Sequence, residues 1–265
     1  MVKWCQLLAV AILIAPGTAV EGQNATQLVE QAVRTELNAD AQDHSRWIYY
    51  EVDRKPMAMV KQWVAETAMG SLTRVLDRNG RTFTKDEQRS MMNNFIQNPG
   101  AQAKQRRGDQ HDDQQATQML SMLPSAFIWT EAGTHDGETV LHFTPDPQFR
   151  PPSWQARVFA AMAGEITVDD KQHRIVSLKG HLIHDVKFWG GLLGDMQAGG
   201  WFEVERREVG DGVWEITDTH VHIQGHALIF KTISEQEDDD KSKFKQLPAN
   251  VSFEQAESDL MNEAG

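Results

Sequence analysis

Cysteine is absent from this sequence except at one position near the start. Cys5 stands within an apolar run, Trp4 to Ala15, which is too short to span a bilayer comfortably and is followed by small residues up to Ala19. This pattern predicts a secretory signal peptide over residues 1–19, cleaved after Ala19. Cys5 would be removed with it, so disulfides, zinc–thiolate sites and thiol nucleophiles are excluded from the mature chain.

Long apolar runs and positive charge are also scarce. No segment after residue 19 is long and apolar enough to cross a membrane. The formal net charge is −12, from 26 basic and 38 acidic residues. A chain this acidic repels phosphate backbones and anionic lipid headgroups. We therefore expect an exported, periplasmic protein that neither inserts stably into a membrane nor binds nucleic acid.

Recognisable catalytic signatures are missing as well. The sequence has no G-x-S-x-G elbow, no H-E-x-x-H motif and no P-loop. The glycine-rich loop Gly190 to Gly200 leads into strand sequence, whereas a phosphate-binding loop leads into a helix. It is either a hairpin connection or a mobile apolar flap over a cavity. Carboxylates are plentiful, but no glycosidase pair is singled out, so we expect a non-enzymatic protein without a cofactor.

Helical and strand-like periods alternate along the rest of the chain. Asn24 is a candidate N-cap, and apolar residues then recur at helical spacing through Asn38. Two more helices are predicted at Lys85 to Gln97 and Gln102 to Leu123, the second stopped by Pro124. Strand-like segments with turn residues between them make up most of the remainder. The predicted strands are residues 46–54, 58–67, 72–76, 81–84, 126–131, 138–143, 166–168, 175–188, 201–209, 213–223 and 227–233.

The order of these elements and their faces predict the fold class. A run of strands, a helical insertion and a second run of strands favour an α+β domain over residues 20–265. Residues 175–188 alternate, with apolar side chains on one side and polar ones on the other. That alternation is typical of an antiparallel sheet with one solvated face. We expect one large curved antiparallel sheet with helices on one face.

Three histidines fall close together in the segment THVHIQGHALIF, residues 219–230. His220 and His222 are an even step apart and project from one face of an unbroken strand, while Gly225 leaves the direction of His226 open. A divalent metal could use such a pair, but zinc sites need three or four converging ligands. Sheet alternation on a solvated face explains the spacing without any metal and is the favoured interpretation, so no metal ligand is assigned. The acidic run from Glu235 to Asp240 lacks the glycine and the ligand spacing of a calcium loop and is predicted to be a solvated turn.

Four long segments together resemble a known group of proteins. They are residues 28–53 (LVEQAVRTELNADAQDHSRWIYYEVD), 64–84 (VAETAMGSLTRVLDRNGRTFT), 149–205 and 226–256. The chain resembles uncharacterised exported proteins, common in Acidobacteria, that are distantly similar to the LolA/LolB-like superfamily of periplasmic lipoprotein carriers. That resemblance covers nearly the whole mature chain. It implies a half-open antiparallel barrel whose concave apolar face is covered by helices and is suited to holding acyl chains.

The leading hypothesis from the sequence is a periplasmic, non-enzymatic protein that binds an apolar ligand, either a lipid or a lipoprotein acyl chain. Such a ligand needs an apolar cavity with few polar groups. The alternative is an envelope interaction or sensor domain without ligand transport, and the less favoured one is a metal-dependent hydrolase using His220 and His222. The same apolar residues could instead be packed solid as a core. The predicted ligand-binding residues are Leu141, Phe143, Leu178, Leu182, Val186, Phe188, Phe202 and Val204.

Overall fold

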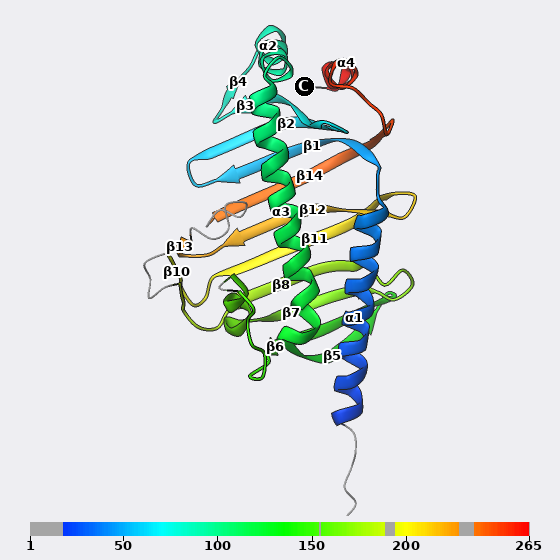
Figure 1. The fold of residues 1–265 in the computed structure, drawn as a ribbon, viewed down its shortest axis with the longest axis vertical. Helices are drawn as coiled ribbons and strands as arrows, with labels where there is room; N and C mark the ends of the chain where they lie inside the picture. Colours follow the sequence, from blue (N-terminus) through cyan, green and yellow to red (C-terminus); the bar gives the residue numbers. More distant parts are fainter. Residues whose placement is uncertain (1–17, 154, 189–193, 228–235, 265) are drawn as a thin grey trace, which may run out of the picture.

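One open antiparallel sheet dominates the structure, a computed structural model that describes residues 18–153, 155–188, 194–227 and 236–264. Within these residues the sheet has eleven strands in the order β4-β3-β2-β1-β14-β12-β11-β8-β7-β6-β5 (Figure 1). The predicted α+β class and large antiparallel sheet are therefore confirmed. The strands are β1 Arg46–Lys55, β2 Ala58–Thr67, β3 Gly70–Arg78, β4 Arg81–Thr82, β5 Phe127–His135, β6 Glu138–Pro145, β7 Met162–Asp169, β8 Ile175–Leu182, β11 Trp201–Gly210, β12 Val213–His222 and β14 Gln236–Leu247.

The acidic run in the last third of the chain is the main correction to the predicted elements. The turn predicted at Glu235 to Asp240 is wrong, because β14 begins at Gln236 and lies between β1 and β12 in the sheet. Asp and Glu are depleted in strands generally. Here β14 forms a backbone ladder with a strand on each side. Asp238 is the register partner of His220 on β12, and Asp240 is the register partner of Val52 on β1. Strand β14 thus joins the strands β1 to β4 to the rest of the sheet.

Two long helices lie across one face of the sheet (Figure 1). They are α1, Thr18–Gln42, and α3, Pro99–Ala126. Helix α1 already runs before Asn24, so Asn24 is not its cap. Helix α3 continues through Pro124 and ends two residues later, so the predicted stop at Pro124 was nearly right. No described helix combines the length and apolar character that a membrane span requires.

Two shorter helices pack against the other face near β1, β2 and β3. Helix α2, Lys85–Ile96, begins with a capping box formed by Thr84 and Glu87. Helix α4, Phe253–Asn262, was not predicted from the sequence; it begins at the Ser252 cap. The core between these helices and the strands contains the following buried residues: Ile48, Trp63, Ala65, Leu72, Leu76, Met92, Val251, Phe253, Ala256 and Leu260.

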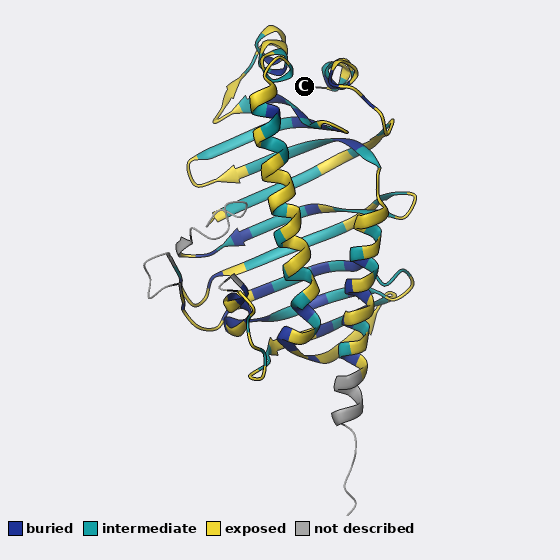
Figure 2. Cartoon of the chain, viewed as in Figure 1, coloured by how far each residue is buried: buried dark blue, intermediate teal, exposed yellow. Residues whose placement is uncertain are grey.

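The larger core lies at the opposite end of the sheet, between α1, the C-terminal half of α3 and strands β5 to β8. Figure 2 shows buried residues gathered in this part of the sheet. Two glycines allow aromatic rings to lie close to the strands: a Cβ at Gly180 would be 2.3 Å from the ring of Phe202, and one at Gly164 would be 2.8 Å from that of Phe143. Both rings therefore lie against the backbone of the neighbouring strand.

A second, small sheet lies beside the large one. It consists of β9 Val186–Phe188, β10 Gly194–Met196 and β13 Gly225–Ala227, in the order β13-β10-β9. The strand predicted over residues 175–188 is therefore broken between Leu182 and Val186. The predicted glycine-rich flap is partly accounted for by β10, while residues 189–193 and 228–235 lie outside the described part of the chain.

Candidate functional site

The face of the sheet beneath α1 and α3, called the inner face below, changes character from one end to the other. Register partners share a face in an antiparallel sheet, so Phe202, Val221 and Glu237 lie in line across β11, β12 and β14. Two residues further along β14, Asp239 is opposite Asp53 of β1. The inner face therefore runs from an apolar half at β5 to β8 into a charged half at β14 and β1.

The predicted ligand-binding residues come together on the apolar half. Leu141 and Phe143 are 0% and 2% exposed, and Leu182 and Val186 are buried in the same core. Leu178 and Phe202 are half-buried and pack against that core. The structure thus places the apolar set around one packed cluster. Val204 is half-buried at its border, and the side chain of Phe188 lies outside the described residues.

A row of charged side chains occupies the inner face next to this apolar half. We call it the charged row; it consists of Glu51, Asp53, Lys55, Glu237, Asp239 and Lys241. Lys55 Nζ lies 2.7 Å from Asp53 Oδ2 and 3.0 Å from Glu237 Oε1. Lys241 Nζ lies 3.5 Å from Asp239 Oδ2 and 3.9 Å from Glu51 Oε1. Four carboxylates thus share two ammonium groups, which leaves the row with an excess of negative charge.

Two oxygens in the charged row have no hydrogen-bond partner in the described structure. They are Oδ1 of Asp53 and Oδ1 of Asp239, both buried. These residues are directly opposite each other on β1 and β14, where like charges destabilise a strand pair. Burial, with the nearby carboxylates of Glu51 and Asp53, raises the pKa of Asp239 to about 6 against the opposing effect of Lys241. An occupant that donates hydrogen bonds would relieve this arrangement.

A second group of acids continues the charged half toward the end of α1. Burial and the charge of Glu215 raise the pKa of Glu66 to about 7, although the backbone N–H of Trp47 donates to its Oε2 at 3.1 Å. Burial, and then repulsion by Asp43, also raise the pKa of Glu215. The half-buried Tyr49 lies near these acids, and burial, followed by the charges of Glu51 and Glu66, raises the pKa of its phenol well above the usual value. The charged half is consequently acidic and partly shielded from water.

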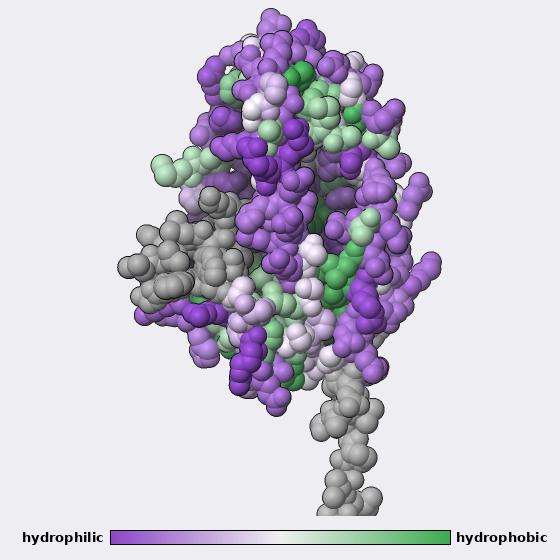
Figure 3. All heavy atoms as spheres, in the orientation of Figure 1, coloured by the Kyte–Doolittle hydropathy of each residue, from purple (hydrophilic) through white to green (hydrophobic). Residues whose placement is uncertain are grey.

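The middle of α3 carries a further group of acidic residues. Burial and the charge of Asp112 raise the pKa of Asp109, and burial and the charge of Asp40 on α1 raise the pKa of Asp113. Space-filling atoms show a hollow beside α3, near the upper end of α1, with apolar side chains at its lower edge (Figure 3). Acidic side chains of α1 and of the middle of α3 therefore lie close to one another.

One buried carboxylate of α1 is bonded to the sheet. Glu36, with its side chain 5% exposed, accepts hydrogen bonds from Arg174 Nη2 at 2.8 Å and from the backbone N–H of Ile175 at 2.7 Å. Arg206 forms a further ion pair with the same carboxylate. Burial alone would raise the pKa of Glu36, but the hydrogen bond from Arg174 and the charge of Arg206 hold it below its usual value. This contact adds a buried polar anchor to the apolar packing of α1, whose Val29 and Ala32 lie in the larger core.

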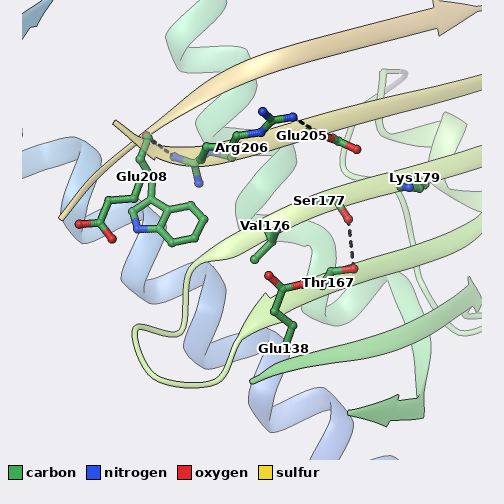
Figure 4. Close-up of a pocket in the computed structure, with 10 residues that line it drawn as sticks. Glu138, Thr167, Val176, Ser177, Lys179, Glu205, Arg206 and Glu208 are labelled. Atoms are coloured by element: carbon green, nitrogen blue, oxygen red, sulfur yellow. Dashed lines mark hydrogen bonds and ion pairs between the residues drawn. The ribbon is translucent and has the colours of Figure 1, made fainter. Parts of the chain in front are cut away.

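An open groove of ≈ 480 Å³ lies at the ends of several strands away from the charged row (Figure 4). Most of its charged side chains already have partners: Lys179 pairs with Glu203, and Arg207 pairs with Glu205 and Asp218. Acidic and basic groups are balanced in its lining, so the groove has no surplus charge to attract an ion. The lining residues are Glu138, Thr167, Val176, Ser177, Lys179, Glu205, Arg206, Arg207, Glu208 and Trp214.

The histidine pair lies on the opposite, outer face of the sheet. His220 and His222 project from the same face of β12, as the sequence predicts, because their register partners on β11 are Glu203 and Trp201. They are 31% and 38% exposed. Both rings contact one oxygen, Asp238 Oδ1, at 2.8 Å from His220 Nδ1 and 3.0 Å from His222 Nε2. The side chain of His226 lies outside the described residues.

Sequence patterns alone do not reveal the charged row, because half of it lies on a strand that was predicted to be a turn. The alternation within EDDDK, residues 237–241, is the signal that could have found it: residues 237, 239 and 241 share the inner face. Comparison with known proteins adds no assignment: neither the protein-family models nor the curated proteins give a match to this chain.

Proposed function

We propose that this is a periplasmic, non-enzymatic protein that binds an amphipathic ligand between the inner face and α3. The apolar part of the ligand would contact the half-buried side chains at the border of the packed core, such as Phe202 and Val204. Its head group would be uncharged or cationic and would donate hydrogen bonds to Asp53 and Asp239. Lipids or lipoprotein acyl chains with such a head are the favoured class, in a half-open barrel of the LolA-like kind.

The observation that carries the proposal is the pair of buried, unpartnered carboxylate oxygens next to an apolar surface. A buried acceptor without a donor costs free energy, so a donor supplied by a ligand is favoured. An anionic head is disfavoured because the charged row, with four carboxylates and two ammonium groups, repels it. The apolar chain contributes about 0.8 kcal/mol per buried CH₂ group. Affinity and head-group choice thus come from different parts of the inner face.

A pair of fluorescent probes with equal chain length tests the proposal. We expect a dansyl-labelled fatty amine to bind with increased, blue-shifted emission and the matching fatty acid to bind about tenfold or more weakly, a difference of about 1.4 kcal/mol. Val204→Trp should abolish binding of the amine, because the added ring fills the border of the apolar half. The measurement is the probe's emission during titration with protein.

Two variants provide the matched comparisons. Ile128→Trp adds the same ring at a side chain that is 50% exposed on β5, and it should leave binding unchanged. Asp53→Asn combined with Asp239→Asn should reduce the preference for the amine, since it removes two negative charges from the charged row. Equal binding of both probes, unaffected by Val204→Trp, would count against the proposal.

A further inference from the structure

We infer that the outer face of the sheet carries a binding site for a divalent transition-metal ion of the zinc class, with Asp218, His220 and Asp240 as ligands. The site lies on the face opposite the charged row and is independent of the proposed ligand-binding function. Asp218 and His220 come from β12 and Asp240 from β14. The ion would therefore join two neighbouring strands in the middle of the sheet.

The backbone register brings the three ligands together. Asp218 and Asp240 are directly opposite each other, and His220 is two residues further along β12 on the same face. One ligand atom from each residue lies within 4.8 Å of the others. Zinc bonds of about 2.0 Å to nitrogen and oxygen place tetrahedral ligand atoms about 3.3 Å apart. Small side-chain rotations are therefore enough to close the three groups around one ion.

His220 already has a carboxylate at one ring nitrogen, as metal-binding histidines usually do. Asp238 Oδ1 contacts His220 Nδ1 at 2.8 Å, which leaves Nε2 as the nitrogen for a cation. A ligand histidine usually donates its other N–H to a carboxylate, which fixes the tautomer and the ring direction. Asp238 would thus orient His220 without binding the ion itself.

His222 belongs to the support and not to the ligand set. Its ring stacks on Trp201 with centroids 4.5 Å apart and an angle of 14° between the planes. Its Nε2 is held by the same Asp238 oxygen, at 3.0 Å. The ring is therefore positioned toward Asp238 and Trp201, and it fixes the carboxylate that orients His220. The pair suggested by sequence spacing thus separates into one ligand and one supporting residue.

Two arginines compete with a metal ion for the carboxylates. Arg54 pairs with Asp240, and Arg207 Nη2 lies 3.3 Å from Asp218 Oδ2. Both arginine side chains are exposed, at 45% and 66%, so they can move away into solvent. One imidazole with two carboxylates suits zinc, cobalt or nickel better than calcium, which prefers oxygen ligands only. The competition lowers affinity but leaves the site intact.

Titration of the metal-free full chain with Zn²⁺ and Co²⁺ at pH 7.5 tests the site. We expect one equivalent of Zn²⁺ by calorimetry and a visible Co²⁺ absorption band typical of imidazole and carboxylate ligands. His220→Ala should abolish both signals, and Asp238→Asn should weaken binding by about 10- to 100-fold. Arg54→Gln should strengthen it by about tenfold, because a competing cation is removed.

The control is His142→Ala, which removes a 59% exposed histidine on β6, 3.8 Å from Glu165. It should leave the stoichiometry and the Co²⁺ spectrum unchanged. Circular dichroism of each variant reports whether the sheet is retained. Metal binding that survives His220→Ala, or the absence of stoichiometric binding even in Arg54→Gln, overturns the assignment and identifies the cluster as an ion-pair network only.

Discussion

Replacing Glu36 by alanine should destabilise the protein by about 3–5 kcal/mol. The substitution leaves two guanidinium groups without their shared carboxylate: the Arg174 side chain is 9% exposed and that of Arg206 is 18% exposed. It also removes the acceptor of the buried Ile175 N–H. Urea unfolding followed by circular dichroism measures the change, and the midpoint should fall markedly at pH 7.

An exposed glutamate on the same helix is the matched control. Glu30 pairs with Arg34 at 3.6 Å, and their side chains are 48% and 64% exposed. Exposed ion pairs of this kind contribute about 0.3–0.5 kcal/mol, so Glu30→Ala should change stability by less than about 0.5 kcal/mol. Similar costs for Glu30→Ala and Glu36→Ala would contradict the role of Glu36 in holding α1.

The effect of Glu36 should also depend on pH. Its folded-state pKa is lowered from the usual 4.5, so its ionised form stabilises the fold at every pH above that value. This contribution is lost as the pH falls through the lowered folded-state pKa. The difference between the wild type and Glu36→Ala should therefore shrink in acid.

Glu66→Gln should change stability in the opposite direction to Glu36→Ala and should stabilise the protein at alkaline pH. The pKa of Glu66 rises from 4.5 to about 7 in the fold, so the folded state binds more protons than the unfolded state between these values. Ionising the buried carboxyl costs about 3 kcal/mol of stability above pH 7. Glutamine keeps an acceptor for the Trp47 N–H and carries no charge, so the variant should gain up to that amount at pH 8.

The gain should fall below about 1 kcal/mol at pH 5, where Glu66 is mostly protonated in the folded state. Glu208→Gln is the control, because the fold lowers the pKa of Glu208 instead of raising it. Its hydrogen bonds from Gln172 and the backbone N–H of Gly212 lower the pKa of Glu208, so removing the charge should not stabilise the protein at pH 8. Denaturant titrations at both pH values measure these differences. A gain in stability for Glu66→Gln that is independent of pH would contradict the raised pKa of Glu66 on the inner face.

The architecture was largely predictable because local signals agree with it. Alternating faces predict most of the strands close to their observed bounds, and the Asn79-Gly80 turn and the Thr84 cap are further local signals that agree with the structure. Helix α4 was missed although its signal is present: Ser252 is a cap, and Phe253, Ala256 and Leu260 follow at helical spacing.

The charged row and the metal-ligand set were not predictable, because both depend on which strands become neighbours. His220 and His222 can be placed on one face from their spacing, but Asp238 and Asp240 meet them only through the pairing of β12 with β14. Likewise, Asp53 and Asp239 are 186 residues apart in sequence and opposite each other in the sheet. Local propensity moreover opposes a strand at EDDD, and the neighbouring Lys55, Lys241 and His220 outweigh it.

Native mass spectrometry of the protein purified from its own cells tests the proposed function most directly. The account predicts a bound amphipathic molecule with an uncharged or cationic head, released by organic solvent and absent from the Val204→Trp variant. Protein that carries no such molecule, and that also fails to take up the fatty amine after purification, would contradict the claim that the inner face holds a ligand.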